Sequence, residues 1–499
     1  MARRLFGAFR RVPAPPDPLA RALADPRRYE TQIDRLQLRH QASGRRDDPS
    51  GEDVAMASLV MHRRRVARLL ATSVSQGRYR LHPAALRTIR VGGKDRIVFS
   101  YPLLDLVVHA VVADLLAERV EPTLSGALHS YRPGRSWWRG VSAFAAFVRA
   151  HSASRPDPRD RGLYVLRRDV ESYTDSIPLA PGSALWPLVT EALGGEEVRT
   201  SPAWPLVEEV VRPRLLGDEG GLATRYRGVA TGQPISVLCF NLYLRDLDHW
   251  LAAIPGAFAA RYSDDLVVAH PDPAVIAQVD AELEARLAAL DLRFNAKKRR
   301  DLYLTGAGRR SEALPAFAGT TTVTFLGMRI GMDGTVALGD RRVRALLREA
   351  ERRARNTARA LRRAPLDVRG RAVAATLDAL LDPDEPVLIG GPAPILVHVV
   401  TDRRQLDWLD HALARIAASA ATGDPGAAAF RQAPYRRIRA DWGLRSLRRA
   451  RDRGARTPEQ RAAAATDPPA SAAGRAWRSR RRLRRAPAPL PLATGRLDG

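Results

Sequence analysis

The sequence predicts an α+β protein, with short β-hairpins in its first two thirds and helices towards its C-terminal end. The segments "RTIRVGGKDRIVFSYP" (87–102) and "RYSDDLVVAH" (261–270) combine β-branched and aromatic residues with turn residues, a pattern typical of hairpins. From about residue 340 onward, apolar residues recur instead at helical spacing. These two kinds of pattern carry the prediction of the fold class.

Composition limits the classes of partner. The chain has 499 residues, enough for two or three domains, and a net charge of +27 that predicts a polyanionic partner. Nucleic acid is the first candidate and a membrane surface the second. No apolar stretch approaches the ~18 residues that span a bilayer, and the basic N-terminus lacks the apolar core of a secretory signal. The single cysteine, Cys239, excludes an intrachain disulfide and a cysteine-cluster metal site. A cytoplasmic location is therefore expected.

The N-terminal third begins with a basic, proline-rich stretch. Residues 1–52 predict a loosely ordered arm with one helix around 28–41. The stretch 54–79 predicts a helix that ends near Gly77, and 87–102 reads as a strand, a Gly-Gly turn and a second strand. Apolar residues at helical spacing over 103–120 predict the next helix.

The middle of the chain alternates strands with helices. "LYVLRRDVESYTDSI" (163–177) is a strand that runs into polar residues, and 228–251 is a glycine-rich turn leading into an apolar helix. The hairpin 261–270 follows, then an amphipathic helix over 273–292. A further hairpin, with a Met-Asp-Gly turn, is predicted over 322–338.

A long basic helix is predicted over 341–363. Its apolar stripe consists of Val343, Leu346, Leu347, Ala350, Ala354, Ala358 and Leu361. Arginines fill the other faces, and a solvated charged surface is the ordinary explanation of such a helix. Because acidic partners are few, contact with phosphates is favoured, and Arg344, Arg348 and Arg355 are the residues proposed for it.

Two adjacent aspartates, Asp264 and Asp265, lie within an apolar hairpin, where carboxylates are costly unless they are paired or bind a metal. A tight turn is the ordinary alternative, since Asp is common in turns. A third carboxylate, Asp169, ends the strand "LYVLRRD". Three such groups suit two divalent ions, which activate a 3′-hydroxyl and stabilise a leaving pyrophosphate. Mg²⁺ prefers such hard oxygen ligands, and Mn²⁺ is the substitute ion.

Lysine is rare in this chain. Of 81 lysines and arginines only three are lysines, namely Lys94, Lys297 and Lys298. In a chain that otherwise uses arginine, they mark positions where an ammonium group matters, unless chance alone has retained them.

The order of these pieces resembles the reverse transcriptases, in particular the prokaryotic group II intron-like lineage. Seven segments between about residues 77 and 330 carry the resemblance: "GRYRLHP" with the hairpin and helix that follow, "SYRPGRS", "RRDVESYTDSI", "GVATGQPISVLCFNLYLRDLD", "RYSDDLVV", "LRFNAKKRR" and "FLGMRI". Each segment is weak alone, but seven in one order are specific. The resemblance implies a right-hand polymerase fold, in which fingers and a palm with an antiparallel sheet precede a helical thumb-like region.

The resemblance also implies roles for individual residues. The implied metal ligands are Asp169, Val170, Asp264 and Asp265; the nucleotide contacts are Lys94, Arg96, Tyr173, Thr174, Thr231 and Gly232; the nucleic-acid contacts are Arg132 and Arg135. Lys298, with Lys297 as the close runner-up, aligns with the family lysine beside the leaving pyrophosphate. Lysine can give up a proton and arginine in practice cannot, so Lys298 is the predicted general acid. The alternative is that both lysines only contact phosphates.

The implied domains follow the motifs. They are a basic arm (1–52), fingers (53–168), a palm with the catalytic site (169–339), a helical thumb-like region (340–453) that includes a second helical stretch at about 402–453, and a disordered basic tail (454–499).

Some positions depart from the family pattern. Thr231 stands where the family commonly has Gln, and Thr174, beside Tyr173, stands where an aromatic normally blocks a ribose 2′-hydroxyl. Such departures fit the atypical prokaryotic reverse transcriptases, which include abortive-infection and other phage-defence types. The resemblance therefore predicts an RNA-directed DNA polymerase that uses a cellular or non-coding RNA template, a DNA or RNA primer and dNTPs, in an oligomeric state left open. The alternatives are a retron or diversity-generating enzyme, an RNA-templated RNA polymerase, and a catalytically idle RNA-binding protein of the same fold.

Overall fold

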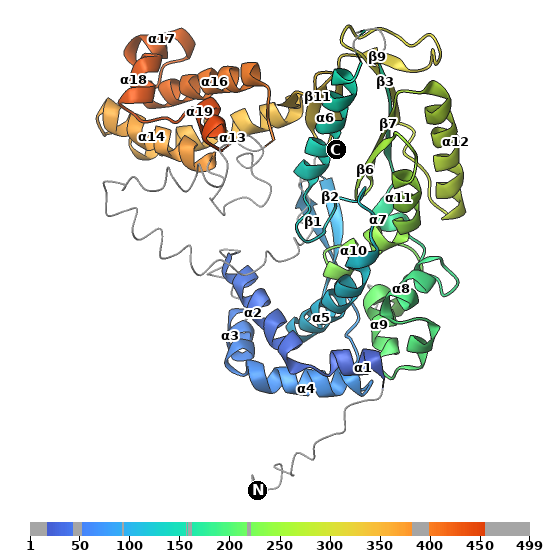
Figure 1. Ribbon diagram of the computed structural model, residues 1–499. Coiled ribbons are helices and arrows are strands. Elements are labelled where there is room, and N and C mark those ends of the chain that lie inside the picture. The colour runs from blue at the N-terminus through green and yellow to red at the C-terminus, as the bar shows by residue number, and fades with distance from the viewer. Residues whose placement is uncertain are drawn as a thin grey trace.

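The computed structural model describes residues 17–42, 52–91, 94–155, 157, 162–216, 221–381 and 399–454 (Figure 1). Within these ranges, no helix has both the length and the apolar character needed to cross a membrane. The predicted tail and the first 16 residues lie outside the described residues.

A mixed sheet of five strands forms the centre of the molecule. In spatial order its strands are β6 (Phe258–Tyr262), β7 (Asp265–His270), β3 (Leu163–Asp169), β8 (Arg300–Leu304) and β9 (Ala318–Thr320). All neighbours pair antiparallel except β8 and β9. The central strand β3 is buried over its first four residues, which explains its nearly continuous apolar sequence. Helix α12 (Pro273–Ala289) packs against β3 and β7, and α6 (Trp137–Ala153) packs against β6.

A β-hairpin and an apolar helix precede this sheet in the chain. Strands β1 (Ala85–Val91) and β2 (Lys94–Ser100) pair antiparallel, and α5 (Leu103–Val120) is largely buried, so both predictions are confirmed. The remaining elements of the first two thirds are η1 (Glu121–Thr123), α7 (Tyr173–Ser176), α8 (Leu185–Leu193), η3 (Glu196–Thr200), α9 (Trp204–Val211), β4 (Arg214–Leu216), β5 (Leu222–Thr224), α10 (Pro234–Tyr243) and α11 (Arg245–Ala252).

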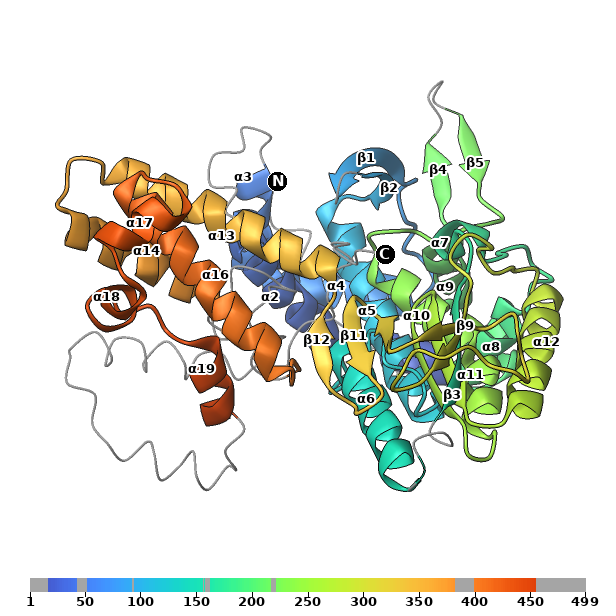
Figure 2. The same cartoon turned by 90° about the horizontal axis from the view of Figure 1, so that it is seen from above.

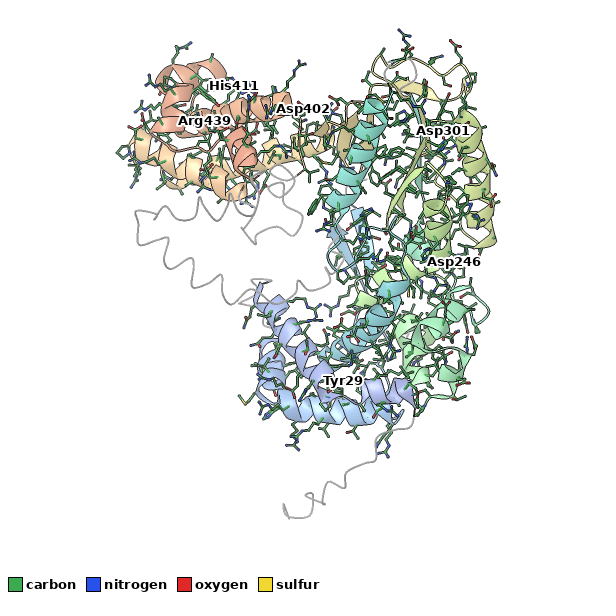
Figure 3. All side chains as sticks on the ribbon, viewed as in Figure 1. Tyr29, Asp246, Asp301, Asp402, His411 and Arg439 are labelled. Atoms are coloured by element: carbon green, nitrogen blue, oxygen red, sulfur yellow. The ribbon has the colours of Figure 1, made fainter. Side chains whose placement is uncertain are left out.

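The N-terminal region differs from the expected loosely ordered arm. Its described part, 17–42, forms α1 (Pro18–Leu23) and α2 (Pro26–Ala42), which pack against α4 (Arg63–Ser75) and α5. Burial of Leu23, Tyr29 and Ile33 in the core holds these helices in place. Figure 3 labels Tyr29 among the N-terminal helices. The predicted helix around 28–41 is confirmed by α2, whereas the expected loose order is wrong for 17–42, because both helices pack into the core.

The helix predicted over 54–79 is divided in two. Helix α3 (Glu52–Met61) ends at His62, and α4 (Arg63–Ser75) continues from there. Gly77, with a φ of 67°, then turns the chain. A side chain at this glycine would collide with the backbone of Pro202, which explains why glycine is required at this position.

The C-terminal third is helical and forms a separate lobe beside the sheet (Figures 1 and 2). A three-stranded sheet leads into it, formed by β10 (Thr322–Phe325), β11 (Met328–Gly331) and β12 (Val336–Leu338). The lobe consists of α13 (Asp340–Ala360), α14 (Leu366–Leu380), α16 (Arg403–Thr422), α17 (Gly426–Gln432), α18 (Tyr435–Ala440) and α19 (Leu447–Gly454). Figure 3 shows His411 and Arg439 within this lobe.

The predicted stripe of α13 faces α14 and α16. Leu346, Ala350, Ala354 and Ala358 are buried there, and Val343 and Leu347 pack beside them. The hairpin, the central sheet and the C-terminal helices together make the predicted right-hand polymerase fold. The domain boundaries drawn from the sequence stay predictions.

Candidate active site

Three carboxylates meet at one end of the central sheet. Asp169, the last residue of β3, lies directly opposite Asp265, the first residue of β7. The β6–β7 hairpin closes with Tyr262 opposite Asp265, so Ser263 and Asp264 form its two-residue loop. Residues directly opposite on antiparallel strands have Cβ atoms about 4.5–5.5 Å apart. The register therefore brings Asp169 and Asp265 together, with Asp264 on the adjoining turn.

Backbone hydrogen bonds fix this corner of the molecule. The N–H of Val170 donates to the carbonyl of Asp264 at 3.0 Å, and the N–H of Asn295 donates to the carbonyl of Asp169 at 2.8 Å. Val170 thus lies at the site where the sequence predicted a ligand, and the role of its carbonyl stays a prediction. The end of β3 is joined both to the hairpin turn and to the "LRFNAKKRR" segment.

Two cations neutralise two of the three carboxylates. Lys298 Nζ lies 2.9 Å from Oδ1 and 2.8 Å from Oδ2 of Asp169. Arg167 Nη2 lies 3.1 Å from both carboxylate oxygens of Asp265. Arg167 was not among the predicted residues, although a signal existed: it is two residues before Asp169, so both side chains leave the same face of β3.

Burial and mutual repulsion act on the acids of the hairpin. Burial, together with the neighbouring Asp169 and Asp265, raises the pKa of Asp264 to about 6. Burial also raises the pKa of Asp265, although Arg167 opposes this shift. The negative charge here is only partly compensated, and hard carboxylate oxygens are the donors that Mg²⁺ prefers, so the residues fit divalent ions.

The three carboxylates are not yet arranged as a complete set of metal ligands. Across the described ranges, no three His, Cys, Asp or Glu side chains are already grouped so that they could hold a metal ion. Lys298 and Arg167 each engage both oxygens of one carboxylate, so they compete with a divalent ion for Asp169 and Asp265.

The structure distinguishes the two neighbouring lysines. Both lysines are exposed, but Lys298 Nζ reaches Asp169, whereas Lys297 uses its backbone N–H, which donates to the side chain of Asn295. The geometry supports Lys298, the first choice of the sequence analysis.

The glycine-rich turn before α10 is attached to β2. The N–H of Phe99 donates to the carbonyl of Thr231 at 3.0 Å, and the side chain of Gln233 donates to the carbonyl of Phe99 at 2.9 Å. Gly232, with a φ of 94°, lies beside Val98. The buried Gln233 was not predicted. It holds the proposed nucleotide-pocket turn against the β1–β2 hairpin.

Lys94 and Arg96, the two basic residues predicted to contact the triphosphate, both lie on β2. Lys94 begins the strand, but its side chain lies outside the described residues. Arg96 is partly buried, and its Nε has no hydrogen-bond partner in the described structure. Burial raises the pKa of Tyr131, which Asp264 raises further and Arg96 lowers. The charge of Arg96 therefore lies near the same ring as the charge of Asp264.

The side chain of Tyr173 is buried against α10, and its predicted nucleotide contact stays a prediction. Its side chain is only 3% exposed, its hydroxyl donates to the carbonyl of Phe240 at 2.7 Å, and its ring packs on that of Phe240. Thr174 is partly exposed, and its carbonyl accepts a hydrogen bond from Val229. Contact of Thr174 with the sugar stays a prediction.

The side chain of Arg132 is largely buried in its own loop. It is 7% exposed, forms an ion pair with Glu121 at 2.8 Å and donates to the carbonyl of Ser125 at 2.6 Å. Its hydrogen-bonding groups serve the loop itself, and its predicted nucleic-acid contact stays a prediction. Arg135 is exposed and donates to the carbonyl of Gly126, and its predicted contact stays a prediction.

The three arginines predicted on α13 share one exposed side of the helix. Arg344, Arg348 and Arg355 are spaced by four and seven residues, which is helical spacing. Within the described ranges none of the three has a carboxylate partner, whereas Arg352 and Arg353 pair with Glu349.

Among solved structures, the chain is similar to several telomerases. Telomerase from Candida tropicalis superposes with a TM-score of 0.40 and 12% identity over 74% of this chain and 63% of that one. Telomerase from Candida albicans, solved in complex with a TWJ fragment of telomeric RNA, gives a TM-score of 0.39 and 11% identity over 75% and 66% of the two chains. A Candida tropicalis telomerase truncated from its C-terminal domain is covered over 54% of its length. The chain thus spans between about half and two thirds of these telomerases. No curated protein matches it.

The family model of the reverse transcriptases (RNA-dependent DNA polymerases) matches residues 104–330. This range contains Asp169, Asp264, Asp265 and Lys298, the four residues that the structure brings together at the end of β3 and β7. Residues 104–330, which are less than half of the chain, therefore form a reverse transcriptase domain.

Proposed function

We propose that this protein copies an RNA template into DNA by adding dNTPs to the 3′-hydroxyl of a primer. The observation that carries the proposal is the convergence of Asp169, Asp264 and Asp265 from two paired strands and one hairpin turn, within the matched domain. Such a set of carboxylates is what nucleotidyl transfer requires.

The proposed ligands of two Mg²⁺ ions are the three aspartates and the backbone carbonyl of Val170. When bound, the ions supply activation of the 3′-hydroxyl and stabilisation of the leaving pyrophosphate. Arg96 provides positive charge for the triphosphate. Lys298, released from Asp169, donates a proton from Nζ to the leaving pyrophosphate.

The biological role is the less specific part of the proposal. The departures at Thr231 and Thr174 support an atypical prokaryotic enzyme of the group II intron-like lineage, acting in phage defence in the cytoplasm with a cellular or non-coding RNA template. A retron or diversity-generating role is the second candidate. The charge of +27 supports RNA binding in either role.

Primer extension tests the proposed activity. With an RNA template, a DNA or RNA primer and Mg²⁺, we expect incorporation of dNTPs, its loss with EDTA and its recovery with added Mg²⁺ or Mn²⁺. Incorporation of rNTPs alone would instead identify an RNA-templated RNA polymerase. Retention of RNA binding without any incorporation would identify an idle RNA-binding protein.

The arginines of α13 give a prediction about salt. Replacing Arg344, Arg348 and Arg355 by Gln should reduce the slope of log affinity against log salt by about 0.7–0.9 per phosphate contact, hence by about 2–3 in total. The measurement is binding of an RNA–DNA hybrid over a salt series. The matched control is Gln at Arg64, Arg65 and Arg68, which removes the same charge from the exposed side of α4. Equal slopes in the two triple variants would show that the arginines of α13 form only a solvated charged surface.

A further inference from the structure

Arg261, two residues before the Ser263–Asp264 turn, is almost completely buried. Its side chain is 1% exposed, and that of its partner Asp248, on α11, is fully buried. Arg261 Nε donates to Asp248 Oδ1 at 2.7 Å, and Nη2 donates to Oδ2 at 2.6 Å. A guanidinium has five N–H groups, so this ion pair leaves three of them for other acceptors.

The three remaining N–H groups reach backbone carbonyls. Nη1 donates to Ser263 at 2.9 Å and to Phe240 at 3.4 Å, and Nη2 donates to Asn241 at 3.3 Å. Phe240 and Asn241 belong to the last turn of α10, where carbonyls have no partner within the helix. A positive charge is also favourable at this negative end of the helix dipole. Arg261 therefore joins the end of α10 to the active-site turn.

The turn is held from both sides. Ser263 has a left-handed φ of 57°, a conformation that costs free energy in a residue other than glycine and persists only where the surroundings fix it. Arg261 binds the Ser263 carbonyl, and the N–H of Val170 binds the Asp264 carbonyl on the opposite side. The backbone on both sides of Asp264 Cα is thus fixed, which restricts where its carboxylate can point.

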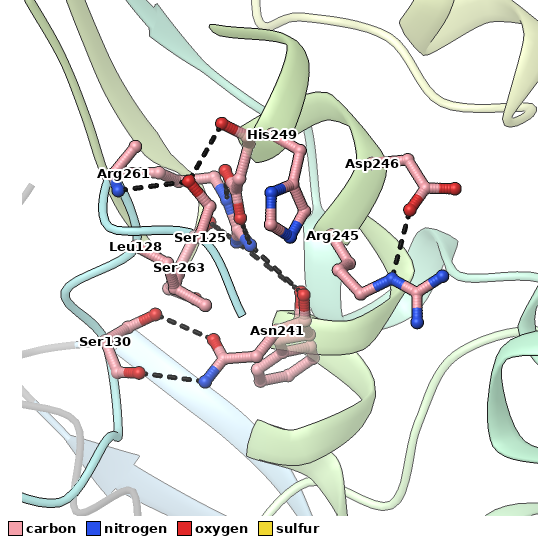
Figure 4. Close-up of polar contacts among 12 residues, drawn as sticks. Ser125, Leu128, Ser130, Asn241, Arg245, Asp246, His249, Arg261 and Ser263 are labelled. Atoms are coloured by element: carbon pink, nitrogen blue, oxygen red, sulfur yellow. Dashed lines mark hydrogen bonds and ion pairs between the residues drawn. The ribbon is translucent and has the colours of Figure 1, made fainter. Parts of the chain in front are cut away.

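The surroundings of Arg261 are themselves ordered by hydrogen bonds (Figure 4). Asn241 and Ser130 exchange two hydrogen bonds of 2.8 Å, and the Ser125 hydroxyl donates to the Asp248 carbonyl. The backbone of Arg261 also pairs with that of Leu128 in an isolated β-bridge. Both elements that supply acceptors to Arg261 are therefore rigidly placed.

We propose that Arg261, supported by Asp248, is a positioning residue for the polymerase reaction, because it fixes the Ser263–Asp264 turn against α10. The proposal rests on the proposed function for its kinetic consequence. The contrasting explanation is a core ion pair that only stabilises the fold. The two differ in a testable way, because a buried ion pair replaced by apolar side chains of similar volume often keeps its stability.

The test is the double variant Arg261→Met/Asp248→Leu. We expect it to fold with a midpoint of unfolding close to that of the wild type. Its affinity for Mn²⁺, measured by electron paramagnetic resonance without nucleic acid, should fall about 10–100-fold, as is typical when residues behind metal ligands are replaced. In primer extension, kcat should fall about 10²-fold, the cost of a small displacement of a reacting group, while KM for dNTP stays within twofold.

The control is Arg245→Met/Glu191→Leu, which removes another ion pair of α11 that does not touch the turn. It should leave Mn²⁺ affinity and kcat unchanged. Should the first double variant fail to fold, Arg261→Lys keeps a charge for Asp248 but offers only three donors, and it should show the same losses in weaker form.

Wild-type Mn²⁺ affinity in a folded double variant, or in Arg261→Lys if the double variant does not fold, would overturn the positioning role. The Mn²⁺ measurement decides this even if the wild type extends no primer, a result that would count against the proposed polymerase function alone.

Discussion

Asp264→Asn should abolish primer extension while making the metal-free protein more stable. The catalytic loss follows from removing one of three charged oxygen ligands. Loss of a single group that stabilises transition-state charge costs about 10²–10³-fold, and loss of a metal ligand should reach or exceed the upper end. Single-nucleotide incorporation on an RNA template measures it.

The gain in stability follows from the raised pKa of Asp264. Its pKa is about 6 in the folded protein, against an ordinary value of 3.8, so the charged form is disfavoured by folding. The wild type therefore loses free energy of unfolding as the pH rises from about 4 to 6 and recovers none of it above. Two pH units correspond to about 3 kcal/mol, and partial exposure reduces this to about 1–3 kcal/mol. The advantage of the Asn variant should be absent below pH 4 and complete above pH 6.

Denaturant unfolding in EDTA between pH 4 and pH 8 checks this prediction, and a parallel series with Mg²⁺ provides the control. An ion that binds only the folded state stabilises it, so Mg²⁺ should raise the stability of the wild type more than that of Asp264→Asn. A variant that is less stable than the wild type at pH 7.5 in EDTA would show that repulsion among the carboxylates does not control this corner of the fold.

The three carboxylates could be predicted from the sequence because their signal is local. Asp169 follows an apolar strand, and Asp264 and Asp265 interrupt another, so each is anomalous within its own ten residues. The pairing of β3 with β7 then follows once the motifs are placed in order. The apolar stripe of α13 is local in the same way, and the structure confirms it.

The roles of the arginines could not be predicted, because they depend on partners far away in the chain. Arg132 and Arg261 look alike in sequence, as do the many exposed arginines of this basic protein. Burial of Arg261 is stabilised by Asp248 on another element, and burial of Arg132 by Glu121. A surplus of surface arginines hides the few that are structural.

The N-terminal helices carried a signal that the composition obscured. Asp17-Pro18 and Asp25-Pro26 each place an N-cap residue before a proline at the first helical position. In the structure the side chain of Asp17 accepts hydrogen bonds from the N–H groups of Leu19 and Ala20. Proline therefore marked helix starts here, and its abundance did not indicate a loose arm.

Lys298→Arg should bind nucleotide nearly as the wild type does and lose most of its maximal rate. Arginine keeps the positive charge but does not give up its proton under ordinary conditions. A general acid contributes about 10²–10⁴-fold, so the rate of the incorporation step should fall by that factor. The pH–rate profile of the variant should also lose the ionisation on its basic limb. Pre-steady-state incorporation measured between pH 6 and pH 10 checks both effects.

The contacts of the two neighbouring lysines provide a control for this experiment. In the described structure it is Lys298 Nζ that bonds both oxygens of Asp169, so Lys297→Arg should keep the wild-type rate within about twofold. Arginine can pair with Asp169 at least as well as lysine does, through two parallel bonds. A variant that is slow only because its guanidinium holds Asp169 away from the metal would regain its rate at high Mg²⁺. A rate that stays low at saturating Mg²⁺ identifies the missing proton as the cause, and a rate equal to that of the wild type reduces Lys298 to a source of charge.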